Sequence, residues 1–426
     1  MESLNWKAVI LTVIILTGVS FAGIYSGGSG TETDPYQIGT VADWQELMDA
    51  NSDWDANFIM IADINLQGIP SIPVGNDING AFTGVFDGNG HVVRNATITN
   101  RPGWHIGLFG AILSGSQIRN LGVEDVNMAG ERDIACLAGW SSGTITNCYA
   151  TGKVGNDSYP SANPSGLVGL NYGTITGSHA ACNVDGQWAG GLVGRNFGTI
   201  TDSYADGKVS GSCLGGLVGW NFGTIVDSHA DGEVNGASYV GGLVGNNDVY
   251  WDPPYYAGSI TRCYATGSVN GGSYVGGLVG TSNSGYPFIS SITDCYATGA
   301  VTGQFRVGGL LGSNGGYTTN CYAVGKVTGS GGGLIGSGIY PTSNCFWDIN
   351  TTGKTTNGGG TGLTTAQMKT LSIFKSAGWD FVDTWGIGEN QTYPFLRTYS
   401  GADLNYDGLV DFIDFAVWAN HWLESF

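Results

Sequence analysis

Short apolar segments, separated by glycine and asparagine, follow one another through the middle of this chain. Between residues 104 and 348 a unit with a Gly-Leu-Val-Gly core recurs about nine times. The cores begin at residues 107, 136, 166, 191, 216, 242, 277, 309 and 333. The shortest spacing is 24 or 25 residues, and longer intervals hold insertions such as Asp248–Ala257 and Ser284–Ile289. A repeat of this length is typical of a solenoid.

The clearest copy has three apolar segments, at 191–194, 198–205 and 207–209. Segments this short cannot bury an apolar face alone, whereas stacked copies can pair their strands about 4.8 Å apart. The 3.6-residue periodicity of a helix is absent, and a propeller blade needs a longer unit with four strands. We therefore expect an all-β fold, a right-handed parallel β-helix with three short strands per coil.

Aligning the copies places similar residues in columns, as stacking requires. One column holds Asn171, Asn196, Asn221 and Asn247. A second holds Cys148, Ser178, Ser203, Ser228, Cys263, Cys295, Cys321 and Cys345. Beside it stand Tyr149, His179, Tyr204, His229, Tyr264, Tyr296, Tyr322 and Phe346. Asparagine tolerates the left-handed conformation of tight bends, and stacked amides can bond to one another. These columns predict ladders along the solenoid axis.

The first residues form an apolar run, Ala8–Gly18, that follows Lys7. Ser20 and Ala22 supply small residues at the −3 and −1 positions of a cleavage site. This run is short for a membrane span and suits a signal peptide. We expect residues 1–22 to be removed, leaving an exported chain without a membrane span. The alternative is an uncleaved N-terminal anchor.

Composition supports an ordered, exported protein. Glycine reaches 74 residues and only 12% of residues are charged, but aromatic residues stand at 12% and apolar residues at 42%. Disordered chains lack such apolar content. The net charge is −19, with the basic residues scattered singly. Such a surface repels nucleic acids and anionic lipid, which excludes both as partners.

The repeat resembles a known family. The run Gly190–Ile200 is similar to the GLUG motif of bacterial secreted and surface proteins. The segments Asp34–Leu47 and Phe82–Gly90 resemble the usual lead-in to such β-helices, and Trp379–Leu396 resembles their usual exit. The resemblance implies a surface or matrix role, in some members adhesive, and brings no catalytic residues with it.

Exposed strand edges at the ends of a solenoid need caps. Trp44–Met48, with Asp43 as N-cap, is predicted to form a short helix over the first coil, and Thr365–Leu371 a second helix near the last. Trp379–Leu396 would then fold back as part of the C-terminal cap. The predicted organisation is a signal peptide at 1–22, an N-terminal cap at 23–57, a parallel β-helix at 58–348, a C-terminal cap at 349–399 and a dockerin-like segment at 400–426.

The C-terminal segment contains the spacing of an EF-hand calcium loop. Its predicted ligands are Asp403, Asn405, Asp407, the carbonyl of Leu409, Asp411 and Asp414, with Gly408 at the sharp turn. An apolar-faced helix follows, and the whole resembles one half of a dockerin. A dockerin has two such loops and only one is visible here. The segment therefore predicts a Ca²⁺ site and leaves a cohesin-like scaffold as one possible partner; the alternative is an acidic tail without metal.

The eight cysteines of an exported chain suggest disulfides, but five occupy one repeat position, where parallel neighbours point the same way. Buried thiols in a ladder are the alternative. Asp202, Asp206, Asp227 and Asp231 form a two-by-two patch that is a solvated edge, a calcium site or a glycosidase pair. His179 and His229 belong to the aromatic ladder. Aromatic side chains that form either a platform for sugar rings or ladder packing are Trp140, Tyr172, Phe197, Trp220 and Phe222.

Uniform repetition without an acid, base and nucleophile together favours a non-catalytic extracellular structural or adhesive protein. We assign no catalytic residues. The main alternative is a carbohydrate-active β-helix, either a lyase, a glycosidase or a binding module. Self-assembly into fibres through the solenoid ends or the C-terminal helix is a third. The expected partners are a second copy of the chain, an extracellular glycan or a scaffold protein.

Overall fold

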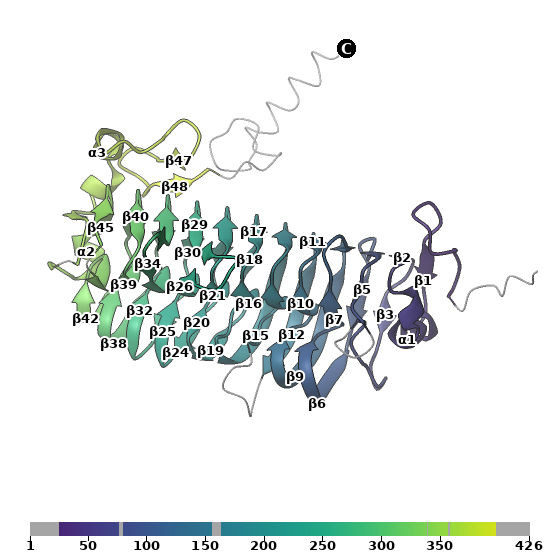
Figure 1. Ribbon diagram of the computed structural model, residues 1–426. Coiled ribbons are helices and arrows are strands. Elements are labelled where there is room, and N and C mark those ends of the chain that lie inside the picture. The colour runs from purple at the N-terminus through teal and green to yellow at the C-terminus, as the bar shows by residue number, and fades with distance from the viewer. Residues whose placement is uncertain (1–24, 76–79, 156–162, 339, 357, 398–426) are drawn as a thin grey trace, which may run out of the picture.

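The computed structural model describes residues 25–75, 80–155, 163–338, 340–356 and 358–397. Over these residues the chain forms a parallel β-solenoid, an elongated rod whose coils succeed one another from the N-terminal to the C-terminal end (Figure 1). The predicted all-β parallel β-helix is confirmed. No helix among the described residues has the length and apolar character that a membrane crossing needs.

Two long sheets run the length of the rod, and neighbouring strands in each are parallel. Sheet A has 12 strands: β1 (Tyr36–Ile38), β2 (Asn57–Met60), β4 (Val85–Asp87), β8 (Gln117–Arg119), β11 (Thr144–Thr146), β14 (Thr174–Thr176), β17 (Thr199–Thr201), β22 (Thr224–Val226), β29 (Ser259–Thr261), β36 (Ser291–Thr293), β40 (Tyr317–Thr319) and β44 (Thr342–Ser343). Sheet C has nine strands: β7 (Phe109–Ile112), β10 (Ala138–Ser141), β13 (Val168–Asn171), β16 (Val193–Asn196), β21 (Val218–Asn221), β26 (Val244–Asn247), β33 (Val279–Ser282), β39 (Leu311–Asn314) and β43 (Ile335–Gly338).

The third side of each coil, sheet B, is longer and in most coils is broken into two or three pieces. Its strands are β3 (Ile64–Asn65), β5 (Val92–Arg94), β6 (Thr97–Ile106), β9 (Gly122–Ile134), β12 (Tyr149–Gly155), β15 (His179–Gln187), β18 (Tyr204–Ala205), β19 (Val209–Ser212), β20 (Leu214–Gly215), β23 (His229–Ala230), β24 (Val234–Gly236), β25 (Ser238–Gly241), β30 (Tyr264–Ala265), β31 (Val269–Asn270), β32 (Ser273–Gly276), β37 (Tyr296–Ala297), β38 (Val301–Gly308), β41 (Tyr322–Ala323), β42 (Val327–Gly332), β45 (Phe346–Asp348) and β46 (Thr361–Leu363). The third strand expected for each coil is therefore a bent side with more than one strand.

Inward columns of branched apolar residues form the core. Ile175, Ile200 and Ile225 face one another across neighbouring strands of sheet A and are fully buried. Val193 and Val218 do the same in sheet C. Burying one such side chain contributes about 1.5–3 kcal/mol, and each coil adds one to every column. Because each coil contacts only its neighbours, the stability of the rod comes from stacking.

The predicted ladders are present. Asn171, Asn196, Asn221 and Asn247 are fully buried, and each of the first three donates its amide to the next at 2.8–2.9 Å. The aromatic column stacks ring on ring from Tyr149 to Tyr322, with centroids 4.6–5.3 Å apart and planes within 10° of parallel. His179 and His229 lie inside this stack, as expected.

The cysteine column is also a ladder. All eight cysteines are free thiols, and all except the half-buried Cys213 are buried. Burial raises the pKa of Cys263 and of Cys321 well above the ordinary value. The alternative of stacked thiols with serine as the small substitute therefore describes this structure.

A helix closes the N-terminal end, but its N-cap differs from the prediction. Helix α1 (Val41–Asp49) begins after Thr40, whose hydroxyl accepts from the Asp43 amide at 3.2 Å. Asp43 is the third helical residue and accepts in return from the Thr40 amide at 2.8 Å, a capping box. Trp44 packs on Phe86, with ring centroids 5.7 Å apart. A short 3₁₀ turn, η1 (Asn51–Asp53), follows.

The C-terminal segment folds back beside the last coils of the rod (Figure 1) and packs on Tyr322 and Phe346, the last residues of the aromatic column. It comprises α2 (Ile349–Thr352), the 3₁₀ turn η2 (Gln367–Lys369), α3 (Leu371–Ser376) and the antiparallel pair β47 (Trp385–Gly386) and β48 (Phe395–Leu396). The predicted helix at Thr365–Leu371 is wrong in its bounds, because a 3₁₀ turn occupies that segment and the α-helix begins at Leu371. Trp385 packs on Tyr322 and donates to Asp294 at 3.1 Å.

Candidate functional site

A column of residues in the left-handed backbone conformation marks the corner between sheets B and C. Its members have φ between 44° and 61°: His105, Asp133, Asn163, Trp188, Cys213, Tyr239, Tyr274 and Arg306. This conformation costs a residue with a Cβ about 1–2 kcal/mol, and glycine avoids the cost. The chain has 74 glycines, yet none stands in this column. Because backbone strain clusters at binding sites, the left-handed column is a candidate functional surface.

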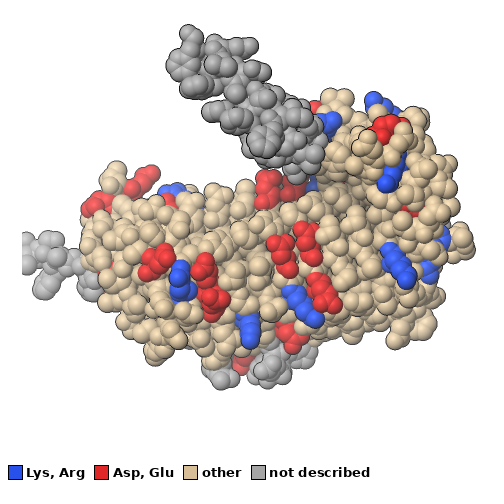
Figure 2. All heavy atoms as spheres, turned by 180° about the vertical axis from the view of Figure 1, so that it is seen from behind, with Lys and Arg blue, Asp and Glu red and all other residues tan. Residues whose placement is uncertain are grey.

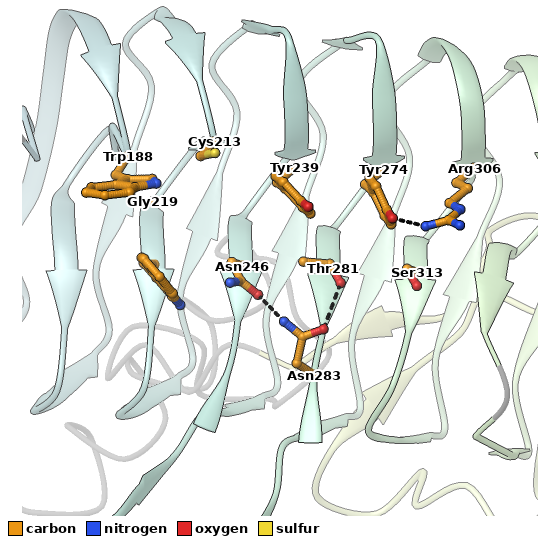
Figure 3. Close-up of a pocket in the computed structure, with 11 residues that line it drawn as sticks. Trp188, Cys213, Gly219, Tyr239, Asn246, Tyr274, Thr281, Asn283, Arg306 and Ser313 are labelled. Carbon is orange, nitrogen blue, oxygen red and sulfur yellow. Dashed lines mark hydrogen bonds between the residues drawn. The ribbon is translucent and has the colours of Figure 1, made fainter. Parts of the chain in front are cut away.

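A groove runs between this column and the outer face of sheet C (Figure 3). Its volume is about 460 Å³. One wall consists of Trp188, Cys213, Tyr239, Tyr274 and Arg306, and the floor of Gly219, Trp220, Asn246, Thr281 and Ser313. The wall residues precede five successive strands of sheet C, from β16 to β39. The groove therefore extends along the rod axis and crosses one coil after another.

The glycine that ends each Gly-Leu-Val-Gly core allows the wall to approach the floor. A Cβ at Gly219 would lie 2.4 Å from the carbonyl oxygen of Trp188. The same contact recurs further along, where a Cβ at Gly280 would lie 2.6 Å from the carbonyl carbon of Tyr239. These distances exclude any residue with a side chain. The repeat core therefore positions the groove as well as the solenoid.

Aromatic rings form much of the groove surface. Trp188 lies against Trp220, with ring centroids 5.6 Å apart at 54°. Tyr239 and Tyr274 stack at 4.8 Å and 18°. The Arg306 guanidinium carbon lies 4.4 Å from the Tyr274 ring centroid, and Arg306 donates to the Tyr274 hydroxyl. In Figure 3 the Trp188, Tyr239 and Tyr274 side chains point from the wall toward the floor.

The polar floor is an amide network. Asn283 donates to Asn246 at 3.0 Å and accepts from Thr281 at 3.2 Å. Asn246 donates in turn to Asp248 at 3.0 Å, which fixes the orientation of its amide. A carboxylate does not occur among the described residues that line the groove. The site therefore offers flat rings and neutral hydrogen-bonding groups, with a cation at one end.

An arginine lies on the other side of Trp220. Arg195 pairs in register with Trp220 across β16 and β21, and its guanidinium carbon lies 5.3 Å from the Trp220 ring centroid. Phe197 and Phe222 lie at 5.4 and 5.7 Å from the same carbon. Burial lowers the pKa of Arg195, and the nearby Asp133 opposes that shift. Arg195 therefore makes cation–π contacts with three aromatic rings.

The aromatic platform considered from the sequence is covered in part. Phe197 and Phe222 are only 5% and 3% exposed. They pack against Tyr250 and Tyr256 of an inserted antiparallel pair, β27 (Val249–Tyr250) and β28 (Tyr256–Ala257). A second inserted pair, β34 (Ser284–Gly285) and β35 (Phe288–Ile289), follows Asn283 of the floor. Phe197 and Phe222 therefore serve packing, whereas Tyr172 is 42% exposed and Trp220 lines the groove.

The N-terminal end of the left-handed column carries a polar cluster. Asp133 is buried and accepts from the Asn163 amide at 2.6 Å. His105 Nδ1 lies 3.2 Å from Asp133 Oδ2, and Arg132 Nε lies 3.7 Å from it. Arg132 stacks over the exposed Trp104 ring at 4.7 Å. A buried carboxylate beside an imidazole can hold the ring in one orientation.

The acidic patch predicted at residues 202–231 lies elsewhere, at the corner between sheets A and B. Asp227 makes two 2.6 Å hydrogen bonds with Arg262, and Asp231 accepts from Thr266 at 2.5 Å. Burial, and then the charge of Asp227, raise the pKa of Asp202. Figure 2 shows basic side chains standing singly among acidic ones on the face it presents. The Asp227–Arg262 pair favours the interpretation of this patch as a solvated, partly neutralised edge.

A metal site is not formed within the described part of the chain, where no three His, Cys, Asp or Glu side chains come together. The predicted calcium ligands Asp403, Asn405, Asp407, Leu409, Asp411 and Asp414 lie outside the described residues, as does the predicted signal peptide. Both stay predictions.

The groove residues Trp188, Tyr239, Tyr274 and Arg306 were missed by sequence reasoning. Each stands two residues before a glycine pair or its equivalent, a column that varies in residue type from copy to copy. The signal was this variability, which contrasts with the constant type of residue in the asparagine and aromatic columns. Variable side chains at a fixed, exposed position are what a binding surface requires on a uniform scaffold.

The family model of the GLUG motif matches four stretches of the chain, residues 189–210, 210–235, 236–270 and 271–302. The chain is 31% identical over 161 residues to halomucin of Haloquadratum walsbyi, which covers 35% of this chain and 2% of halomucin. It is 44% identical over 85 residues to an Evansella cellulosilytica protein provisionally named a Gly-rich membrane protein, covering 18% of this chain and 10% of that relative. The chain thus spans a small part of either relative.

Two solved structures align with parts of the chain at low identity. A Bacteroides ovatus protein provisionally named an immunoglobulin A1 protease has a TM-score of 0.44 at 18% identity, covering 88% of this chain and 95% of that one. An IgA1 protease has a TM-score of 0.45 at 16% identity, covering 61% of this chain and 21% of that one. At such values the likeness says nothing about activity. The chain is a β-solenoid repeat protein that carries GLUG motifs.

Proposed function

We propose that this protein is a non-catalytic, adhesive component of the cell surface or extracellular matrix, and that it holds an extended glycan along the groove. The observation that carries the proposal is the wall of Trp188, Tyr239 and Tyr274, displayed in a strained conformation on a rigid sheet. Sugar rings present an apolar face and a rim of hydroxyls. Aromatic faces match the first, and the amides of Asn246 and Asn283 match the second.

A polymer suits this groove better than a compact ligand. The wall residues repeat with the coil spacing, about 4.8 Å between paired strands. A pyranose ring in a linear chain is of similar length, so successive sugars can meet successive coils. Each coil then adds contacts of the same kind, and affinity accumulates along the chain. Repetition of the scaffold is therefore used for binding as well as for stability.

The experiment is a glycan-binding screen with the full chain, the Trp188→Ala variant and a matched control, Tyr317→Ala. Tyr317 is an exposed aromatic residue of β40 on sheet A. Binding of one glycan class that is weakened at least about tenfold by Trp188→Ala and unchanged by Tyr317→Ala supports the proposal. Absence of binding to every glycan class, with the protein folded, contradicts it.

A carbohydrate-active enzyme is the second candidate, and the pair of His105 and Asp133 favours it. A buried carboxylate beside an imidazole is an arrangement that general acid–base catalysis uses. A lyase or glycosidase would release unsaturated or reducing sugar from a bound polysaccharide, and His105→Gln would abolish that release. We rank it second because neither His105 nor Asp133 lines the groove that we propose holds the glycan.

End-to-end assembly is left out of the proposal, because α1 covers one end of the rod and the segment from α2 onward covers the other. The C-terminal loop is proposed to bind Ca²⁺ through Asp403, Asp407 and its other predicted oxygen ligands. Calorimetry with Ca²⁺ on the full chain and on Asp407→Ala tests this: heat lost in the variant supports the site, and no heat in either removes it. A cohesin-like scaffold protein, titrated into the same two proteins, tests the proposed partner of this segment.

A further inference from the structure

We propose that the groove selects a glycan that carries negative charge, with Arg195 and Arg306 as the residues that meet the anionic groups. This inference rests on the proposed glycan-binding function and adds the chemical class of the ligand. The observation behind the inference is that Arg195 and Arg306 have no carboxylate of the described residues within ion-pair distance.

Several arginines lie within ion-pair distance of a carboxylate, among them Arg94, Arg119, Arg132 and Arg262. Arg195 and Arg306 do not; both lie over aromatic rings. The Nε of Arg195 is buried without a hydrogen-bond partner among the described residues, and so is Nε1 of the adjacent Trp220. An unsatisfied buried donor costs about 1–3 kcal/mol. Acidic side chains outnumber basic ones by 34 to 15, so the absence of a partner at both positions is unexpected.

These two arginines bracket the groove. Arg195 lies on β16, beside the floor residue Trp220, and Arg306 forms the far end of the wall before β39. At the usual spacing of paired strands, four coils separate them by about 19 Å along the axis. The aromatic rings of Trp188, Tyr239 and Tyr274 lie between. An extended glycan with acidic groups along its length would contact a cation near each end and rings in the middle.

The net charge of −19 opposes binding of any anion. The distance of each charge from the groove therefore determines how strongly it acts on a bound anion. Charges are screened beyond about 8 Å at physiological ionic strength. Two carboxylates near the groove are hydrogen-bonded to amides: Asp248 accepts from Asn246 at 3.0 Å, and Asp133 accepts from Asn163 at 2.6 Å. The groove lining itself contains Arg306 and no carboxylate among the described residues. The remaining surface discourages binding of anionic polymers elsewhere, which makes this site selective.

The test compares three polymers by affinity electrophoresis or calorimetry: polygalacturonate for carboxylate, dextran sulfate for sulfate esters and dextran as the neutral reference. The variants are Arg306→Gln, Arg306→Lys, Arg195→Gln and the control Arg119→Gln. Arg119 pairs with Asp87 on sheet A, away from the groove, and its replacement changes net charge equally. Arg306 is exposed, so Arg306→Gln folds normally even where Arg195→Gln does not.

We expect at least one anionic polymer to bind, Arg306→Gln to weaken it at least about tenfold, and Arg306→Lys to restore most of the loss. Arg119→Gln leaves binding unchanged, and raising the salt concentration weakens it. Binding of dextran sulfate alone, or of polygalacturonate alone, assigns the anionic group. The inference is overturned if dextran binds as tightly as polygalacturonate and dextran sulfate and Arg306→Gln has no effect. If Trp188→Ala nevertheless loses binding, the proposed function stands. Absence of binding to all three overturns the inference, whereas the proposed function fails only if every other glycan class also fails to bind.

Discussion

The backbone of Trp188 lies directly against Gly219 of the next coil, so that a Cβ at Gly219 would come within 2.4 Å of the Trp188 carbonyl oxygen. The glycine of the repeat core and the aromatic residue of the groove wall are therefore one structural unit. The tight approach places the Trp188 ring over Trp220, at a centroid separation of 5.6 Å. Changes in the core are thus expected to alter the groove.

Replacing Gly219 with alanine tests this coupling. The added methyl group must displace the Trp188 backbone, and overpacking of this kind typically costs about 1–3 kcal/mol. Gly155→Ala is the control, because a Cβ there meets nothing within 4 Å. Denaturant unfolding is expected to show a lower free energy of unfolding for Gly219→Ala only. Equal stability of the two variants would show that the coil spacing relaxes freely.

The asparagine ladder is expected to be a main source of stability in the central coils. Asn196 accepts from Asn171 at 2.8 Å and donates to Asn221 at 2.9 Å in a fully buried position. Asn196→Ala leaves both neighbours short of a partner, at about 1–3 kcal/mol for each unsatisfied group. Thermal unfolding measures the effect, with the exposed Asn183→Ala as reference. A shift no larger than that of the reference would mean that water replaces the amide.

Some of this architecture could be predicted from the sequence and some could not. Asn196, Tyr204 and Ile200 repeat in type as well as position, so their ladders and the solenoid followed from the pattern. Trp188 and Arg306 share a position and differ in chemistry, so they become visible as one wall only when the coils are stacked. Tyr250, which packs over Phe222, belongs to an insertion. The periodicity of the repeat does not predict how that insertion folds.

Lowering the pH is expected to weaken the aromatic ladder. Burial lowers the pKa of His179 and of His229 from the ordinary value of 6.5, although Asp206 and, for His229, Asp231 oppose the shift. Below pH 6.5 the unfolded chain therefore binds more protons than the folded chain, and stability falls until the folded-state pKa is reached. Above pH 6.5 this effect is absent.

The measurement is the midpoint of thermal unfolding at about pH 7.5 and about pH 5.5, in the wild type and in the double variant His179→Phe, His229→Phe. The rings of the variant keep the stack with Tyr204 and Tyr264 but cannot bind a proton. The wild type is expected to lose more stability on acidification. An equal loss in both proteins would assign the effect to other groups.

Cys213 is expected to report on the groove. It is the one half-buried thiol of eight and lines the groove wall, whereas the others are buried. Burial raises its pKa, so alkylation of the native protein should be slow at neutral pH and faster in alkali. Mass spectrometry should find one modified thiol in the native chain and eight after denaturation without reductant. Fewer than eight would reveal disulfides, and a bound glycan should slow the native reaction.

The most direct measurement for the whole account is calorimetry with oligosaccharides of increasing length, cut from the glycan that binds best. The wall from Trp188 to Arg306 crosses five successive strands of sheet C. The affinity is therefore expected to rise with each added sugar until the chain spans those five coils, and then to level off. Loss of the Tyr274 ring should remove the gain from the longer chains. A disaccharide that binds as tightly as a hexasaccharide would contradict the claim that successive coils bind successive sugars.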